Sequence, residues 1–435
     1  MPVFDSKNWN SAVFQKYLET VPRVKQNALL KAGILRTRSD LKSLLVDQVG
    51  GNYINVPIVG RIGGDVLNYD GATNITATGI GTFLQSMIVF GRAKAWQEKD
   101  FTQDITGKNF MEEIAKQVAN YWDDVDQADL LAVLGGIFGV SQGSFAEKHT
   151  LDLTSETDKT VGATSLSNAI QKAAGANKNI FALVIMHSQV ATNLENKQLL
   201  DYVKGVDKDG MQKDLSLATW NGRTVLIDDD VPTTISYTGA GVYTVTLAGS
   251  NASTGDKFTV AGETYTVQEA DTKTAVGVAT SIASLFSNDD NYTVTRTNAV
   301  LTFTEKSGKY GTGEPAVTTD SESMTIEADT TTAPTSVTNY TTYILGKSCI
   351  DFCDCGAKVP NETKRDELTD GGIDMLITRQ RHLLAPVGFS YINTSKISPM
   401  ASDLATADNW GLVRDTSGIY YPSNAIAVAR IISQG

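Results

Sequence analysis

Cysteine and histidine are scarce in this sequence of 435 residues, which contains three of each. All three cysteines, Cys349, Cys353 and Cys355, lie in one stretch, CIDFCDC. An odd number in so short a stretch excludes the disulfide framework of a small secreted protein and favours a reducing compartment such as the cytoplasm. Without a second cysteine pair or a nearby histidine, the stretch also lacks the four ligands of structural zinc, so we expect buried free thiols.

Long apolar segments are missing as well. The start, MPVFDSKNWN, is polar and lacks the pattern of a signal peptide. The longest apolar runs, LLAVLGGIFGV and IFALVIM, are far shorter than the ~20 residues that cross a bilayer. We therefore predict that the protein has no membrane partner.

Positive charge is in deficit. The chain has 37 basic and 49 acidic side chains, a formal net charge of -12 and a pI near 4.8. Dedicated nucleic-acid binders neutralise phosphates with clustered lysine and arginine, so any contact with DNA should be weak and independent of sequence. The apolar fraction of 41% is ordinary for globular proteins, and the length predicts two or three domains.

Two strands flank a long polar loop in the N-terminal part of the chain. Residues 9–35 carry apolar side chains at helical spacing, interrupted by Pro22, and predict an extended arm with short helices. YINVPIV and FLQSMIVFGRAKAW read as strands, joined by the glycine-rich GRIGGDVLNYDGATNITATGIG. A connection this long without its own core is normally functional or disordered, so we expect it to contact another molecule.

The clearest helix is predicted over residues 109–134. One stripe carries Phe110, Ile114, Val118, Tyr121 or Trp122, Val125 and Leu131, of which we take Phe110, Ile114, Val118, Trp122 and Val125 as core positions. The acidic side chains Glu112, Glu113, Asp123 and Asp124 are expected to face away from this stripe. Gly135 and Gly136 should weaken the end of the helix.

Residues 161–232 predict an α/β unit, followed by a change in composition. IFALVIMH and RTVLIDDDVP read as strands, and Thr164 and Ser188 should cap the helices SLSNAIQKAA and QVATNLENKQLL. From about Thr233 to Asn339 the chain is rich in threonine, glycine and alanine, with five alternating strand candidates and one helix, TKTAVGVATSIASLF, between the third and fourth. This composition predicts a small β-rich inserted domain, after which TTYILGKSCIDF resumes the strand pattern.

No combination of residues predicts catalysis. The chain has no GxSxG motif, and His187 beside Ser188 lacks a third partner, so a helix cap is the simpler interpretation. The run Asp228–Asp230 lacks the spacing of a calcium loop and predicts a solvated turn. GRIGGD at 60–65 lacks the lysine and the following helix of a phosphate loop. We predict no catalytic residue, no cofactor and no metal.

Two stretches carry a resemblance to a known family. In ITGKNFMEEIAKQVANYWDDVDQADLLAVLGGIF an aromatic pair precedes a glutamine, and an LLAVL run ends in Gly-Ile-Phe. VPIVGRIGGDVLNYDGATNITATGIGT is followed by GRAKAW. With the order of elements, these stretches resemble the spine helix and the extended loop of the major capsid protein of tailed bacteriophages, which has the Hong Kong 97 type of fold. The resemblance covers about residues 1–232 and 340–395.

The resemblance implies an α+β fold with an N-terminal arm, an extended β-hairpin loop, a spine helix, and peripheral and axial domains. The β-rich insertion resembles accessory domains of phage virion proteins, which implies a position on the outside of the shell. The expected segments are the arm at 1–48, the loop hairpin at 49–100, the peripheral domain with the spine helix at 101–160, the axial domain at 161–233, the insertion at 234–339, the axial return at 340–359, and the peripheral return with the C-terminal segment at 360–435.

The resemblance also implies a structural protein, not an enzyme, that assembles as hexamers and pentamers into an icosahedral head around double-stranded DNA. Expected partners are a portal, packaged DNA through weak contacts, and a separate scaffolding protein, because the chain starts at Met1 without an extension to be cut off. The expected location is the virion, after assembly in the bacterial cytoplasm. Loop residues expected to contact a neighbouring subunit are Arg61, Asp65, Tyr69 and Asp70.

Some relatives in this family join subunits through isopeptide bonds from a loop lysine. Here no lysine occurs between Lys42 and Lys94, and the one basic residue in the loop is Arg61, a poor nucleophile. We therefore expect a shell held by non-covalent contacts, with Arg61 either paired to a carboxylate of a neighbour or simply solvated.

Three alternatives remain. A tail sheath or tail tube would also fit an inserted β domain, although the single long helix after a hairpin argues against it. A nanocompartment shell of the same fold is disfavoured by the insertion. A hydrolase with an unrecognised site is the third.

Overall fold

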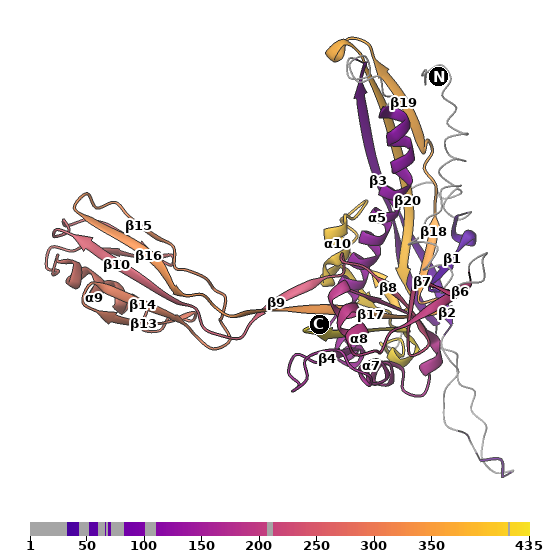
Figure 1. Ribbon diagram of the computed structural model, residues 1–435, viewed down its shortest axis with the longest axis horizontal. Coiled ribbons are helices and arrows are strands. Elements are labelled where there is room, and N and C mark those ends of the chain that lie inside the picture. The colour runs from indigo at the N-terminus through magenta and orange to yellow at the C-terminus, as the bar shows by residue number, and fades with distance from the viewer. Residues whose placement is uncertain are drawn as a thin grey trace. The chain divides into compact units, whose positions relative to one another are not determined.

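The computed structural model describes residues 33–42, 52–59, 66, 68–70, 82–100, 110–206, 212–415 and 418–435 (Figure 1). At 110–116, 119, 203–206, 212–217 and 370 it describes the backbone alone. Contacts divide the chain into two compact units, which we describe separately. The first is formed by residues 1–232 with 340–433, and the second by residues 233–339.

A six-stranded sheet organises one half of the first unit. The strands follow the order β1-β18-β20-β3-β2, and β19 pairs with β20. Their bounds are β1 Leu35–Thr37, β2 Tyr53–Val59, β3 Thr82–Lys99, β18 Ile350–Asp354, β19 Asn361–Asp366 and β20 Ile373–Pro386. The strands predicted on either side of the loop are β2 and β3, which pair antiparallel from Tyr53 opposite Ile88 to Val59 opposite Thr82.

The long helix α5, Phe110–Phe138, runs along β3 and β20 (Figure 1). Because side chains alternate along a strand, the sheet has two apolar faces. Phe90 and Leu384 belong to the large core that also contains Leu130 and Leu134 of α5. Cys353 and its neighbours belong to a smaller core, which is formed by the side chains that alternate with these along the strands and lie on the other face of the sheet.

The C-terminal half of α5 differs from the prediction. The helix does not end at Gly135 and Gly136 but continues to Phe138. A Cβ atom at Gly136 would lie 2.2 Å from the carbonyl oxygen of Leu404 and 2.6 Å from Nε1 of Trp410, whereas a Cβ at Gly135 would meet nothing within 4 Å. Glycine at 136 therefore allows close packing against the 404–410 segment.

The prediction that Asp123 faces away from the core is wrong. Its side chain is buried at 7% exposure, while Asp124 is exposed. The reason is that Asp123 lies beside His382 and Leu384 of β20, so the surface of α5 that faces the six-stranded sheet is wider than a single stripe.

The other half of the first unit is an eight-stranded sheet. Its order is β4-β23-β17-β5-β8-β7-β6, and β9 pairs with β17. The bounds are β4 Thr150–Asp152, β5 Phe181–Met186, β6 Asp201–Val206, β7 Gln212–Trp220, β8 Arg223–Ile227, β9 Thr233–Tyr237, β17 Ser336–Gly346 and β23 Val428–Ser433. The predicted apolar strand is β5, whose Val184 shares a buried core with Leu166 of helix α7, Ser165–Ala174, and with Val190 of helix α8, Ser188–Asn196.

Both predicted helix caps in this half need correction. Thr164 stands at the N-cap of α7 but its side chain makes no capping hydrogen bond. The N-cap of α8 is His187, whose Nδ1 accepts from the backbone N–H of Gln189 at 3.1 Å, and Ser188 is the first residue of the helix. An unprotonated imidazole nitrogen supplies the acceptor that a serine hydroxyl was expected to provide.

The second unit contains two small sheets and one helix around a core of its own. The sheet orders are β13-β14-β10-β16 and β12-β11-β15. The bounds are β10 Val242–Gly249, β11 Lys257–Val260, β12 Glu263–Thr266, β13 Tyr292–Thr297, β14 Val300–Glu305, β15 Val317–Thr319, β16 Met324–Thr332 and α9 Ala275–Leu285. The five predicted strands and the helix form as expected, whereas β15 and β16 were not predicted, because β15 is short and β16 ends in threonines without apolar alternation.

Glu305 is a buried carboxylate at the end of β14. It accepts hydrogen bonds from the backbone N–H groups of Gly241, Gly311 and Gly313 at 2.8, 2.9 and 2.9 Å, and from the hydroxyl of Tyr243 at 3.1 Å. Burial acts to raise the pKa of Glu305, but the backbone hydrogen bonds outweigh it and leave the pKa below its usual value. The carboxylate therefore fixes the glycine-rich loop that follows β14.

The remaining elements are short. Strands β21, Phe389–Tyr391, and β22, Trp410–Leu412, pair with each other, and the others are α6 Phe145–His149, α10 Ala401–Ala405, η2 Gln142–Ser144, η3 Lys178–Ile180, η4 Thr369–Gly371, η5 Ala407–Asn409 and η6 Ser423–Ala425. Within the described ranges no single helix is long and apolar enough to cross a membrane, and one bent pair, 120–138 with 142–149, meets that test by length and composition only. With 23% helix and 42% strand, the predicted α+β class is confirmed.

Candidate functional site

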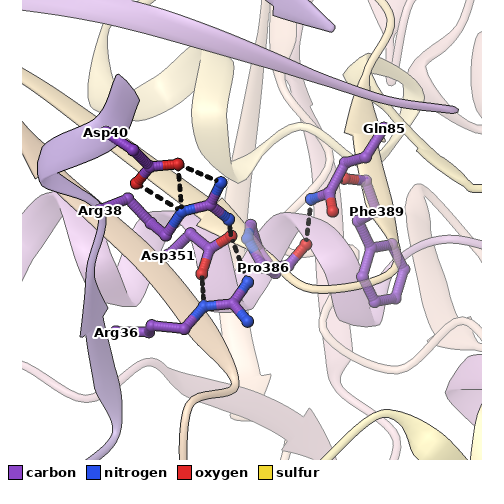
Figure 2. Close-up of polar contacts among 7 residues, drawn as sticks. All are labelled: Arg36, Arg38, Asp40, Gln85, Asp351, Pro386 and Phe389. Carbon is purple, nitrogen blue, oxygen red and sulfur yellow. Dashed lines mark hydrogen bonds and ion pairs between the residues drawn. The ribbon is translucent and has the colours of Figure 1, made fainter. Parts of the chain in front are cut away.

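A buried carboxylate ties β1, the first described strand, to the six-stranded sheet (Figure 2). Asp351 on β18 is 1% exposed and accepts from Arg36 Nε at 2.5 Å, from Arg36 Nη2 at 2.7 Å and from Arg38 Nη1 at 3.3 Å. Arg38 also donates to Asp40, with Nη2 2.8 Å from Oδ2. We call Arg36, Arg38 and Asp351 the arginine clamp.

The two arginines of the clamp keep their charges in the folded protein. Hydrogen bonding to Asp351 raises the pKa of Arg36, and hydrogen bonding to Asp40 raises the pKa of Arg38. The same contact with Arg38 lowers the pKa of Asp40. Since β1 pairs with β18 over only three residues, the clamp adds to the burial of Ile34, Leu35 and Leu41 in attaching this part of the chain to the sheet.

A buried amide fixes the base of the β2–β3 hairpin. Gln85 on β3 donates from Nε2 to the carbonyl oxygens of Pro386 and Phe389, each at 2.8 Å (Figure 2). On the neighbouring strand, the hydroxyl of Tyr53 donates to the carbonyl oxygen of Asn393. Both strands of the hairpin are therefore fastened to the end of β20 and to the segment that follows it.

An ion pair joins the hairpin to α5. Arg92 on β3 donates from Nη2 and Nε to the two carboxylate oxygens of Asp129, at 2.8 and 3.1 Å. Burial raises the pKa of Asp129, although Arg92 acts in the opposite direction. Arg92 also donates to the carbonyl oxygen of Pro399 at 2.8 Å, so a single side chain links hairpin, helix and the 399 segment.

The predicted loop contacts are only partly described. Arg61 and Asp65 lie outside the described residues. Tyr69 is 91% exposed, and Asp70 accepts a hydrogen bond from Asn68 Nδ2 at 3.2 Å. The contact of these four residues with a neighbouring subunit stays a prediction.

Two of the five predicted core positions of α5 are fully buried. Val118 lies in the core, and Trp122 is 2% exposed with Nε1 donating to Thr378 Oγ1 on β20 at 3.1 Å. Val125 is partly buried. Phe110 and Ile114 belong to α5, but their side chains lie outside what the structure describes.

The residues weighed as catalytic or metal-binding have structural roles. His187 caps α8, and its Nε2 lies 3.8 Å from Asp229 Oδ1. The prediction of a solvated turn at Asp228–Asp230 is wrong for Asp228, which is buried and accepts from the backbone N–H of Asp230 at 3.2 Å. In the part of the chain that the structure describes, no three His, Cys, Asp or Glu side chains are arranged to hold a metal ion.

The cysteines are buried free thiols, as predicted. Burial raises the pKa of Cys353, and raises the pKa of Cys349 and Cys355 to about 12. Thiols with such pKa values carry almost no thiolate at neutral pH and are poor nucleophiles.

The sequence did not lead us to the clamp or to Gln85. One signal was available, since Asp351 interrupts the apolar stretch TTYILGKSCIDF and Gln85 interrupts a predicted strand. A buried polar side chain needs partners, but the sequence does not say that those of Asp351 are Arg36 and Arg38, which precede it by 315 and 313 residues.

Comparison with known proteins identifies similar proteins among phage capsid proteins. No family model matches the chain. Over 226 residues the chain is 24% identical to the major capsid protein of Bacillus phage SPP1, an alignment that covers 52% of this chain and 67% of that protein. The chain is a relative of phage major capsid proteins. This confirms the resemblance seen in the sequence.

Solved structures of phage capsids align with most of the length of this chain. The capsid of Helicobacter pylori bacteriophage KHP30 aligns with a TM-score of 0.44 and 10% identity, covering 92% of this chain and 87% of that one. The capsid of Ralstonia phage GP4 aligns with a TM-score of 0.45 and 8% identity, covering 93% and 88%.

Proposed function

We propose that the chain is the major capsid protein of a tailed bacteriophage, with a fold of the Hong Kong 97 type, and that it assembles into the icosahedral head shell. The observation that carries this proposal is the identity with the SPP1 major capsid protein over 226 residues. The geometry supports it. Buried contacts fasten the β1 strand and the hairpin at their bases, so that the segments beyond can gain their own burial on neighbouring subunits.

Negative-stain microscopy of the purified full-length chain tests this function. Closed isometric shells are the expected result. Tubes would indicate a tail sheath or tail tube, and small discrete oligomers would indicate a protein that does not build a shell. Either result would overturn the proposal.

The proposed domain roles follow the segments expected from the sequence. The six-stranded sheet with α5 takes the peripheral role, with 1–48 as the arm and 49–100 as the loop hairpin. The eight-stranded sheet takes the axial role of 161–233 and of the first part of 340–359, whereas β18 in the second part of that segment belongs to the six-stranded sheet. Two short strands from the peripheral segments 101–160 and 360–435, β4 and β23, also join the eight-stranded sheet.

The insertion, residues 234–339, is proposed as a separable accessory domain on the outer face of the shell. It has its own core, and its two ends lie together, since Thr238 N donates to the carbonyl oxygen of Thr335 at 2.8 Å. Replacing residues 234–335 with a short Gly/Ser bridge should leave shell formation intact. Aggregated subunits from that deletion would contradict a separable domain.

The contacts of the loop with a neighbouring subunit are proposed to involve Arg61, Asp65, Tyr69 and Asp70 and to be non-covalent. The support is the absence of lysine between Lys42 and Lys94. Particles boiled in detergent should give one band near 46.7 kDa. A ladder of covalent oligomers would contradict the proposal.

The proposed partners beyond other copies of the chain are a portal, a separate scaffolding protein and the packaged DNA. The net charge of -12 supports only weak contact with DNA. Assembly in the bacterial cytoplasm, a final location in the virion and the lack of an enzymatic role complete the proposal.

A further inference from the structure

A small cavity lined by both polar and apolar side chains lies between α5 and the six-stranded sheet. Its volume is about 30 Å³. The polar side chains that line it come from α5 and β20, and apolar rings of β3 and β18 close it; among them are Asp123, Asp126, Gln127, His382, Phe90 and Phe352.

Gln127 lines this cavity, and its side-chain amide lacks hydrogen-bond partners among the described residues. Its side chain is 4% exposed, and neither Nε2 nor Oε1 has a hydrogen-bond partner among the described residues. A buried amide without partners costs free energy, because it loses its hydrogen bonds to water and gains none in return. Such an amide at the wall of a cavity indicates a ligand that can both accept and donate hydrogen bonds.

The cavity suits water in size and in chemistry. A water molecule needs roughly 10–15 Å³ of such volume and two to four polar partners. Gln127 offers a donor and an acceptor, the carboxylates of Asp123 and Asp126 offer acceptors, and His382 Nε2 lies 3.6 Å from Asp126 Oδ1. A metal ion is disfavoured, since no three acidic, histidine or cysteine side chains of the described residues are arranged to hold one.

We propose that this cavity is a buried hydration site, in which ordered water binds the Gln127 amide and bridges it to the neighbouring polar side chains of α5 and β20. At this point water then adds a polar contact between α5 and the sheet beside the packed apolar side chains. The proposal does not depend on the proposed function.

Replacing the Gln127 amide with an apolar group of similar length tests whether the cavity holds water, because the stability of the protein should change in opposite directions in the two cases. If water is bound, Gln127→Met removes the amide that holds it, and the urea midpoint of the full-length subunit falls. If the cavity is dry, the same change removes two unpaired polar atoms, and the midpoint rises. Gln117→Met, at an exposed position of α5, controls for helix propensity.

A density map of the unmodified full-length protein, at a resolution that shows ordered water, gives a second readout that does not depend on the variant folding. We expect a peak in the cavity within hydrogen-bond distance of the Gln127 amide. An empty cavity in the map, or a midpoint for Gln127→Met that is equal to or above that of Gln117→Met, would overturn the proposal.

Discussion

Replacing Asp351 with asparagine should release β1 from the sheet. The carboxylate is 1% exposed and accepts three hydrogen bonds from two guanidinium groups. Hydrogen bonds to buried charged groups contribute about 1.5–3 kcal/mol each. The Arg36 side chain is 45% exposed, so water replaces part of what is lost. We therefore expect D351N to weaken the attachment of β1 by about 2–3 kcal/mol.

Trypsin cleavage after Arg36 and Arg38 measures this attachment directly. Both arginines are engaged while β1 pairs with β18, and cleavage requires the strand to detach. Since about 1.4 kcal/mol corresponds to a tenfold change in population, D351N should be cut roughly 30- to 150-fold faster under conditions where opening is rapid.

Asp40 provides the matched control. It binds Arg38 as well, but its side chain is 60% exposed, so D40N should change the attachment by less than about 0.5 kcal/mol. Equal cleavage rates for D351N and D40N would show that the buried carboxylate does not hold the strand, and would refute the reasoning.

Three further variants test the packing of the two units. Trp122→Asp should abolish shells in electron micrographs, because it buries a charge at a cost of several kcal/mol, whereas exposed Asp124→Asn should assemble normally. Gly136→Ala should lower the melting temperature through its clash with the 404–410 segment, while Gly135→Ala should raise stability by up to about 1 kcal/mol. Glu305→Gln should destabilise the second unit by about 2 kcal/mol at pH 7 in calorimetry. Because the folded pKa of Glu305 is lowered, its contribution is present above the unfolded pKa near 4.3 and is lost as the pH falls through the folded pKa, so the difference should vanish in acid.

The elements that the sequence predicted are those with a strong local period. The alternation in YINVPIV, the helical stripe before Leu131 and the apolar run of β5 each result from burial of one face or of both faces. The five strands and the helix of the insertion were predicted for the same reason. Such patterns can be read from residues that are close together in the sequence.

What was not predicted depends on partners distant in sequence. Asp123 is buried because it lies against His382 and Leu384 of β20, and Gly136 is required by the carbonyl oxygen of Leu404. His187 caps α8 since its imidazole is placed by the end of β5. The partners of Asp351 are likewise set by the pairing of β1 with β18, which no local period encodes.

The measurement that tests the central claim most directly is a cryo-electron microscopy reconstruction of particles formed by the full-length chain. Our account predicts a closed icosahedral shell of pentamers and hexamers, with the β2–β3 hairpin of each subunit lying across a neighbour. A helical tube, or a ring of subunits that does not close into a shell, would contradict it.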